Sequence, residues 1–232
     1  MTKLLIFTAT YNEINNVEEL ITNIKKNCVI ADILIIDDNS PDGTGVFLKK
    51  KEQEDSKLKI IVREKKLGLD TAHKIAYQYA LSNNYDYLIT MDADHSHNPS
   101  EIPNFLKYIQ NTDFVLGSRY MRGGENKLSF FRFLLSYFGN KFIKFMLNVE
   151  CTEFTTSYRA FNLKRMHNFN LSIINSKGYS FFMETIFQIK KRGFSITEIP
   201  IIFEARLKGD SKIPKMELFR TLKNVFILKY FN

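Results

Sequence analysis

The chain has 232 residues, of which 44% are hydrophobic and 25% are charged, and this composition excludes a mostly disordered protein. The length suits one large α/β domain, or one domain with a short appendage. Charge is unevenly distributed, because residues 1–118 hold 13 basic and 17 acidic residues, whereas residues 119–232 hold 20 and 8. The formal net charge of +8 therefore divides into −4 for the first part and +12 for the second.

Phenylalanine follows the same division, since 17 of the 21 phenylalanines come after Ser118. A basic, Phe-rich segment is typical of a protein that meets an anionic and apolar partner, such as a lipid phosphate at a membrane surface. Solubilising charge together with ordinary core phenylalanines explains the composition equally well. The sequence contains no nucleic-acid-binding motif, so nucleic acid is not a predicted partner.

Membrane spans and disulfides are not expected either. No stretch of about 18 continuous apolar residues occurs, so no spanning helix is predicted. Cys28 and Cys151 lie far apart and lack a metal-binding spacing, which indicates two unpaired thiols in a reducing cytosol.

The first part of the chain alternates apolar, β-rich runs with helical periods. We predict strands at 3–8, 32–37, 58–63, 87–91 and 113–118, and helices at 15–26, 44–54, 71–82 and 99–110. Near-continuous apolar strands separated by helices indicate a mostly parallel sheet with helices on both faces. Ligands of such sheets bind beyond the carboxyl ends of the strands.

The second part is less regular. We predict helices at 130–147, 181–192 and 216–230, and strands at 157–162 and 195–203. Pro200 indicates an edge strand or a bulge, because proline cannot donate to a ladder. Residues 128–147 and 216–230 are basic and amphipathic, so we interpret them as helices that lie at a bilayer surface. Core-packing helices are the alternative.

Two carboxylates, Asp92 and Asp94, follow the strand predicted at 87–91. Residues two apart on an extended segment point to the same side. Two hard oxygen ligands on one side can hold Mg²⁺ or Mn²⁺ and leave positions for phosphate oxygens and water. An Asp-x-Asp pair alone is a weak signal, but its place at a strand end strengthens it.

Histidines at 95 and 97 come directly after this pair. An Asp-x-Asp-His-x-His run could indicate a hydrolytic zinc centre, but the other ligands of such a site are not evident. Histidines in this position are more often loop residues or partners of the metal ligands. Ser96 is a further candidate ligand of the metal or of its water.

The segment 37–44 joins a strand to a helix through a turn rich in Asn, Pro, Asp and Gly. It is either a plain turn or a nucleotide site in which Asp38 accepts hydrogen bonds from a ribose or a base.

The glycine patterns of dinucleotide-binding folds and P-loops are missing, and so is the Gly-x-Ser-x-Gly of hydrolases. The later cations Arg119, Arg132, Arg206 and Lys212 are either phosphate-binding residues or ordinary surface charges.

Taken in order, these pieces resemble the family 2 glycosyltransferases, and within them the dolichol-phosphate or polyprenol-phosphate mannose synthases. The matching runs are 10–13, 36–44, 63–69, 91–99, 117–120, 157–159, 177–179, 183–184, 198–201, 206 and 209–212. The resemblance implies the GT-A fold, a Rossmann-like and mostly parallel sheet followed by a C-terminal amphipathic helical region.

The resemblance also implies roles for individual residues. Those around the nucleoside are Ala9, Tyr11, Glu13, Ile36 and Asp38. Those at the donor diphosphate and metal are Asp92, Ala93 and Asp94, with Ser96 also on the metal and with Arg206 and Lys212 closing over the diphosphate. Those at the lipid phosphate are Arg119, Arg132 and Ser136, and the implied catalytic residues are Asp94, Arg119 and Arg132.

The sequence departs from the family pattern at a few positions. Ala9 replaces a usual Pro, Asn39 a common Gly, His95 an aliphatic residue and Tyr137 a frequent Arg, while Thr156 and Ser157 replace a Gly-Ser pair. None of these changes removes a charged catalytic group. They leave the sugar and the acceptor less determined than the reaction class.

The implied reaction is inverting, metal-dependent transfer of mannose from GDP-mannose to a polyprenyl monophosphate. The implied protein is one GT-A domain, peripheral on the cytoplasmic face of a membrane, with residues 1–118 binding the nucleotide sugar and residues 119–232 facing acceptor and membrane. The sequence does not determine whether a membrane-anchoring partner subunit takes part. The alternatives are another family 2 transferase with a different nucleotide sugar or a glycan acceptor, and a non-catalytic basic module for lipid or RNA.

Overall fold

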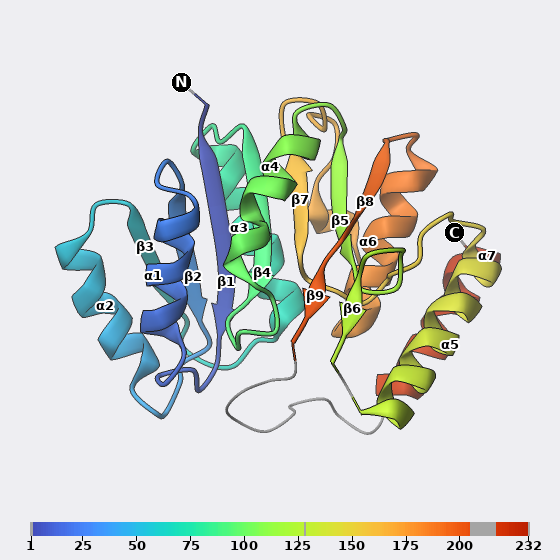
Figure 1. The fold of residues 1–232 in the computed structure, drawn as a ribbon, viewed down its shortest axis with the longest axis horizontal. Helices are drawn as coiled ribbons and strands as arrows, with labels where there is room; N and C mark the ends of the chain where they lie inside the picture. Colours follow the sequence, from blue (N-terminus) through green and yellow to red (C-terminus); the bar gives the residue numbers. More distant parts are fainter. Residues whose placement is uncertain (1, 128, 205–216, 232) are drawn as a thin grey trace.

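The computed structural model describes residues 2–127, 129–204 and 217–231. Figure 1 shows a twisted sheet covered by helices. The strands are β1 (Leu4–Thr10), β2 (Asp32–Asp37), β3 (Leu58–Val62), β4 (Tyr87–Asp92), β5 (Phe114–Ser118), β6 (Glu125–Asn126), β7 (Arg159–Asn162), β8 (Ile196–Pro200) and β9 (Ile202–Phe203). The helices are α1 (Val17–Asn27), α2 (Thr44–Glu54), α3 (Leu69–Ser82), α4 (Ile102–Ile109), α5 (Phe130–Leu147), α6 (Tyr179–Lys191) and α7 (Glu217–Phe231), with short 3-10 turns at Pro99–Glu101 and Leu171–Ile173.

The main sheet has seven strands in the order β3-β2-β1-β4-β7-β5-β8. β7 runs antiparallel to both of its neighbours, whereas the other pairings are parallel. The predicted α/β class and mostly parallel sheet are confirmed. The direction of β7 was not predicted, because an apolar run does not reveal which way its strand points. β7 and β8 join the same sheet as the strands before Ser118, so this sheet is built from both parts of the chain.

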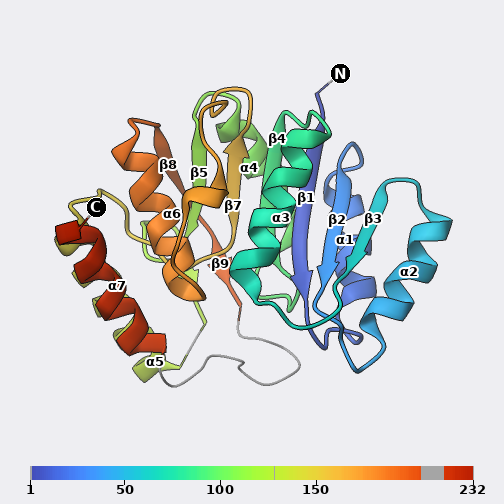
Figure 2. The same cartoon turned by 180° about the vertical axis from the view of Figure 1, so that it is seen from behind.

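The strands fill a core on each face of the sheet. In β1, Leu5 and Phe7 point into one core, and Leu4 and Ile6 point into the other, as the period of two requires. α3 and α6 cover the first face, while α1 and α4 cover the second (Figures 1 and 2). Because both faces are covered, the strands are apolar along most of their length.

The predicted strand at 195–203 is divided into β8 and β9. Pro200 is the last residue of β8, opposite Ser118 at the end of β5, and β8 is an edge strand, as its proline indicated. Ile201 then donates its N–H to the Ser118 carbonyl over 3.1 Å. After this point the chain turns to pair with β6 in a small second sheet, which the sequence did not predict.

Helices α5 and α7 lie side by side at the β8 end of the sheet (Figures 1 and 2). α5 buries Asn140, Ile143 and Leu147, and α7 buries Val225 and Leu228. Both helices occur where the sequence predicted them. Within the described ranges, no helix is long and apolar enough to cross a bilayer.

Candidate active site

The loops that follow β1, β2 and β4 enclose a cavity of about 430 Å³ at the carboxyl edge of the sheet. This edge points to the bottom of Figure 1. The register aligns Ala9 of β1 with Ile36 of β2 and with Asp92 of β4, so the three strands end together. The predicted residues that line the cavity are Ala9, Tyr11, Glu13, Asp38, Asp92, Ala93 and Asp94.

The two neighbouring aspartates after β2 have different surroundings. Asp37 is fully buried and accepts hydrogen bonds from Thr10 Oγ1 at 2.8 Å and from Ser40 Oγ at 2.6 Å, so it ties the β1 loop to the β2 loop. Asp38 lines the cavity, forms an ion pair with Arg63 and accepts a hydrogen bond from the Gly68 backbone N–H. Asp37 is therefore structural, whereas Asp38 borders the cavity, and its predicted contact with a ligand stays a prediction.

Left-handed turns follow three of the strands. Asn12, Asn39 and His95 have φ values of 59°, 55° and 63°, and they come shortly after β1, β2 and β4. Asparagine tolerates this conformation better than most residues, so Asn39 can stand where the family commonly has glycine. His95 in this conformation is unusual and holds a tight turn beside the two carboxylates.

Asp92 is held in place by its neighbours. His97 Nδ1 accepts a hydrogen bond from the Asp92 backbone N–H at 3.0 Å, and Ser157 Oγ donates to Asp92 Oδ1 at 2.5 Å. Burial lowers the pKa of His97, and its Nε2 lies 3.2 Å from Thr156 Oγ1. His97 is thus neutral and bonds to the acidic loop. This agrees with its interpretation as a partner of the metal ligands and not with the zinc-centre interpretation. Ser157 itself lines the cavity, which the sequence did not predict.

Asp94 and Asp92 fit an open site for a divalent cation. Both carboxylates face the cavity and supply the hard oxygen ligands that Mg²⁺ and Mn²⁺ prefer. The described residues contain no cluster of three or more His, Cys, Asp or Glu able to hold a metal. Two carboxylate ligands leave positions on such an ion open for substrate phosphate and water. Ser96 Oγ donates to Asp94 Oδ1 at 2.6 Å, so it contacts the pair, and its role as a ligand stays a prediction.

Tyr11 and Lys66 form one wall of the cavity. Lys66 Nζ lies 3.8 Å from the centroid of the Tyr11 ring, a cation–π contact. Lys66 belongs to the run at 63–69 that matched the family, but no role had been predicted for it. Glu13, on the same side, is nearly buried and accepts a hydrogen bond from Asn16 Nδ2 at 2.7 Å.

A second wall comes from residues more than 100 positions further along the chain. Lys177, Tyr179 and Phe182 line the cavity, together with Arg220 at the start of α7. Asp70 Oδ1 accepts the Gly178 N–H at 3.4 Å, and this bond joins the wall to α3. Sequence reasoning gave these residues no role in the cavity, although the family-like run at 177–179 was a signal.

Arg119 belongs to a buried ion pair beside the cavity. Its Nε donates to Glu153 Oε2 at 2.8 Å, and a second nitrogen donates to Thr155 Oγ1 at 3.1 Å. Burial opposes ionisation, but the facing Glu153 carboxylate raises the pKa of Arg119 above its ordinary value. Thr155 lines the cavity, so Arg119 reaches the cavity edge through this residue.

Three further predicted residues, Ile36, Arg132 and Ser136, are not among the described residues that line the cavity. Ile36 is buried in the core between sheet and α3. Arg132 is exposed on α5, and Ser136 Oγ accepts a hydrogen bond from the Tyr120 hydroxyl at 2.5 Å. Arg206 and Lys212 lie outside the described residues. The ligand contacts predicted for these five residues stay predictions.

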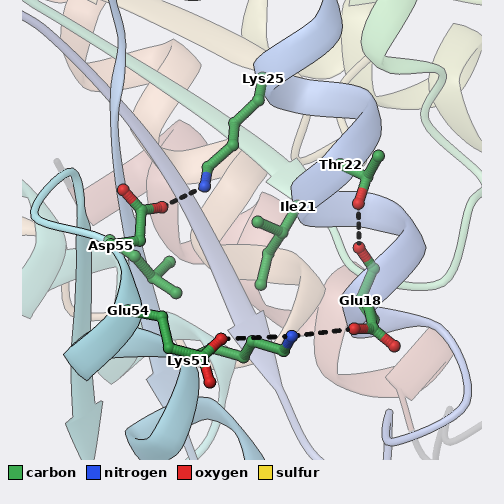
Figure 3. A pocket seen from close by; sticks show the side chains of 8 residues that line it. Glu18, Ile21, Thr22, Lys25, Lys51, Glu54 and Asp55 are labelled. Carbon is green, nitrogen blue, oxygen red and sulfur yellow. Dashed lines mark hydrogen bonds and ion pairs between the residues drawn. The ribbon is translucent and has the colours of Figure 1, made fainter.

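A second, smaller cavity of about 240 Å³ lies between α1 and α2 (Figure 3). Lys25 pairs there with Asp55, and Lys51 lies 3.1 Å from Glu18 and 3.5 Å from Glu54. The lysines of this cavity are therefore paired with its carboxylates, and we assign no ligand to it.

Comparisons with known proteins identify the family of this chain. Residues 5–167 match the family described as "Glycosyl transferase family 2". The chain is 34% identical over 212 residues to an undecaprenyl-phosphate mannosyltransferase of Micrococcus luteus. The alignment covers 91% of this chain and 87% of the relative. The chain is equally 34% identical over 212 residues to a polyprenol monophosphomannose synthase of Mycolicibacterium smegmatis, covering 90% and 80%.

Solved structures share the fold at low sequence identity. A glucosyl-3-phosphoglycerate synthase of Mycobacterium tuberculosis, in complex with Mn²⁺ and UDP, matches with a TM-score of 0.63 and 16% identity over 98% of this chain and 78% of that one. A mannosyltransferase of Pyrobaculum calidifontis, in complex with GDP-Man and Mn²⁺, matches with a TM-score of 0.57 and 16% identity over 97% and 69%. These matches show the GT-A fold. The family match and the two relatives at 34% identity establish that this chain belongs to glycosyl transferase family 2.

Proposed function

We propose that this protein transfers mannose from GDP-mannose to a polyprenyl monophosphate. The observation that carries the proposal is the 34% identity, over about nine tenths of the chain, to two enzymes named for that chemistry. The cavity with Asp92 and Asp94 at the sheet edge supports a nucleotide-sugar donor. The chain would form one domain, with residues 1–118 binding the nucleotide sugar and residues 119–232 facing the acceptor and the membrane.

The donor would lie along the strand ends. Asp38 is positioned to accept hydrogen bonds from the ribose or base, and the Tyr11 ring offers a flat apolar surface beside it. Asp92 and Asp94 would face the diphosphate, with Arg206 and Lys212 closing over it. Mg²⁺ or Mn²⁺, when bound at the two carboxylates, supplies positive charge for the departing diphosphate.

In the transfer step an oxygen of the acceptor phosphate attacks C1 of the sugar. A bond from this oxygen to C1 forms, the bond from C1 to the donor diphosphate breaks, and the electron pair leaves with the nucleoside diphosphate. The phosphate is already ionised near neutral pH, so no strong general base is required. Catalysis then depends on positioning and charge, with Arg119, Arg132 and Ser136 proposed to hold the acceptor phosphate.

The paired helices α5 and α7 support a peripheral attachment to the membrane. α5 exposes Phe131, Leu135, Phe138 and Phe145 as one stripe at helical spacing, on the side away from its buried residues. α7 adds the exposed Phe226, Ile227, Tyr230 and Phe231. Exposed apolar side chains grouped on one face of a helix favour an interaction surface, and the basic second part of the chain suits anionic lipid. We infer that this face meets the cytoplasmic side of a bilayer, directly or with an anchoring subunit.

The test is a screen of nucleotide sugars against a short polyprenyl phosphate in the presence of Mg²⁺ or Mn²⁺. The proposal expects GDP-mannose to give a polyprenyl phosphomannose and GDP, with chelation of the metal stopping the reaction. If only another nucleotide sugar supports transfer, the sugar of that donor replaces mannose in the proposed reaction. Transfer only to a glycan acceptor would refute the lipid acceptor.

A further inference from the structure

We propose that Lys177 and Arg220 bind the acceptor phosphate, in addition to the residues that the family resemblance implied. The inference rests on the proposed function and names two phosphate-binding residues for it. Lys177 precedes α6 and Arg220 lies in the first turn of α7, so the two cations come from separate elements of the second part of the chain. Both line the cavity that holds Asp92 and Asp94.

The distribution of charge in the cavity supports this assignment. Most charged side chains among the described lining residues are carboxylates, and Lys66 is held over the Tyr11 ring at the nucleoside end. The other cations among the described lining residues are Lys177 and Arg220, in the wall that comes from the second part of the chain. A phosphate monoester that must approach the sugar needs cations on the acceptor side, because the acidic strand ends would otherwise repel it.

The surroundings of the two cations suit a phosphate that carries an apolar tail. Tyr179 and Phe182 line the same wall, so the cations have apolar surface beside them. Arg220 also lies on the helix whose later residues, Phe226 and Phe231 among them, are exposed at the proposed membrane face. α7 therefore connects the cavity to the surface from which a lipid acceptor has to arrive.

The predicted acceptor residues adjoin this wall. Arg119 donates a hydrogen bond to Thr155, and Thr155 lines the same cavity as Lys177 and Arg220. α5, with Arg132 and Ser136 in its first turns, packs beside α7, and both helices begin at the end of the molecule where the strands have their carboxyl ends (Figure 1). The phosphate would thus be held between α5, the segment just before α6, and α7.

The experiment compares Arg220→Gln and Lys177→Gln with the wild-type chain, using farnesyl phosphate as the acceptor and GDP-mannose with Mn²⁺ as the donor. Each lost charge-assisted hydrogen bond should raise the KM for farnesyl phosphate by about tenfold or more, with the KM for GDP-mannose within about twofold of wild type. Arg220→Lys should recover part of the loss, because it restores the charge. Lys223→Gln is the control, since it removes an exposed cation from the same helix.

Calorimetric titration of farnesyl phosphate into the donor-free proteins gives a readout that does not need turnover. Weaker binding by both variants, with normal binding by Lys223→Gln, supports the inference even if the wild type uses a different sugar donor. Unchanged farnesyl phosphate binding in Arg220→Gln and Lys177→Gln would overturn it, and so would a wild-type protein that does not bind farnesyl phosphate. A rise confined to the KM for GDP-mannose would also overturn it, by assigning the two cations to the donor.

Discussion

The backbone N–H of Asp92 donates a hydrogen bond to Nδ1 of His97 over 3.0 Å, and the imidazole thereby fixes the end of β4. Its other nitrogen lies 3.2 Å from Thr156 Oγ1, in the segment just before β7. The neutral ring is fully buried and packs against Tyr158 at a centroid distance of 4.9 Å. A single histidine therefore joins the acidic loop to the loop that carries Ser157.

Replacing His97 by Ala should lower both stability and activity. The Asp92 N–H and Thr156 hydroxyl lose a buried partner, which costs about 1–3 kcal/mol in the free energy of unfolding. Urea denaturation measures this loss, and calorimetry with GDP and Mn²⁺ measures the expected fall in nucleotide affinity. His97→Asn, which keeps an acceptor near the Nδ1 position, should recover part of both. An Ala variant with wild-type stability would contradict the role given to this bond.

Asp94→Ala should abolish metal-dependent transfer while the fold stays intact. Removal of this carboxylate takes away a hard ligand for the ion that neutralises the leaving diphosphate, and we expect turnover to fall by at least about 100-fold. Transfer assays over a Mn²⁺ titration test this, with circular dichroism as the check on folding. Asp55→Asn is the matched control, because Asp55 pairs with Lys25 in the second cavity (Figure 3). Near-wild-type turnover in Asp94→Ala would exclude the proposed metal ligand.

Glu153→Gln should destabilise the fold by about 3 kcal/mol, because it leaves the buried Arg119 guanidinium without its counter-charge. Urea denaturation at neutral pH measures the change. The double variant Arg119→Met, Glu153→Gln removes both charges, keeps an acceptor for the Thr155 N–H and hydroxyl, and should be more stable than Glu153→Gln alone. If the double variant is instead the less stable of the two, the uncompensated charge is not the cause of the loss.

Stability should fall as the pH drops below about 6.5, in part because of His73. Burial, followed by the nearby Arg159 charge, lowers the pKa of His73 from 6.5 to about 3. In this interval the unfolded chain binds a proton that the folded chain does not, so acidification favours unfolding. His73→Phe keeps a ring among Phe7, Phe181 and Phe182 and should flatten the dependence of unfolding free energy on pH. An unchanged slope between about pH 7 and pH 5 would contradict this assignment.

The double variant Phe131→Asp, Phe138→Asp should lose binding to anionic vesicles without losing stability. The two rings are 82% and 61% exposed, so their replacement removes little core packing. Flotation with liposomes that contain or lack anionic lipid, at low and high salt, measures the binding. Val46→Asp is the control, because Val46 is 80% exposed on α2, at the opposite end of the sheet (Figure 1). Equal binding by wild type and double variant would refute the α5–α7 face.

The sequence by itself determined the secondary structure and the acidic half of the site. Apolar periodicity is local, so nearly every predicted helix and strand occurs within a few residues of its predicted position. Parallel strands have their carboxyl ends at one edge of a sheet, so Asp38, Asp92 and Asp94 could be brought together from their positions after strands. The ordered motif runs supplied the family.

Tertiary structure alone decided the direction of β7, the small sheet of β6 and β9, and the presence of Lys177 and Arg220 in the cavity lining. Arg119 meets Glu153 across 34 positions, and Gly178 meets Asp70 across 108. Contacts at such separations depend on how helices and strands pack, which local periodicity does not encode. Lys177 and Arg220 join the cavity only because α6 and α7 pack together at this end of the fold, where they give an acidic site its positive side.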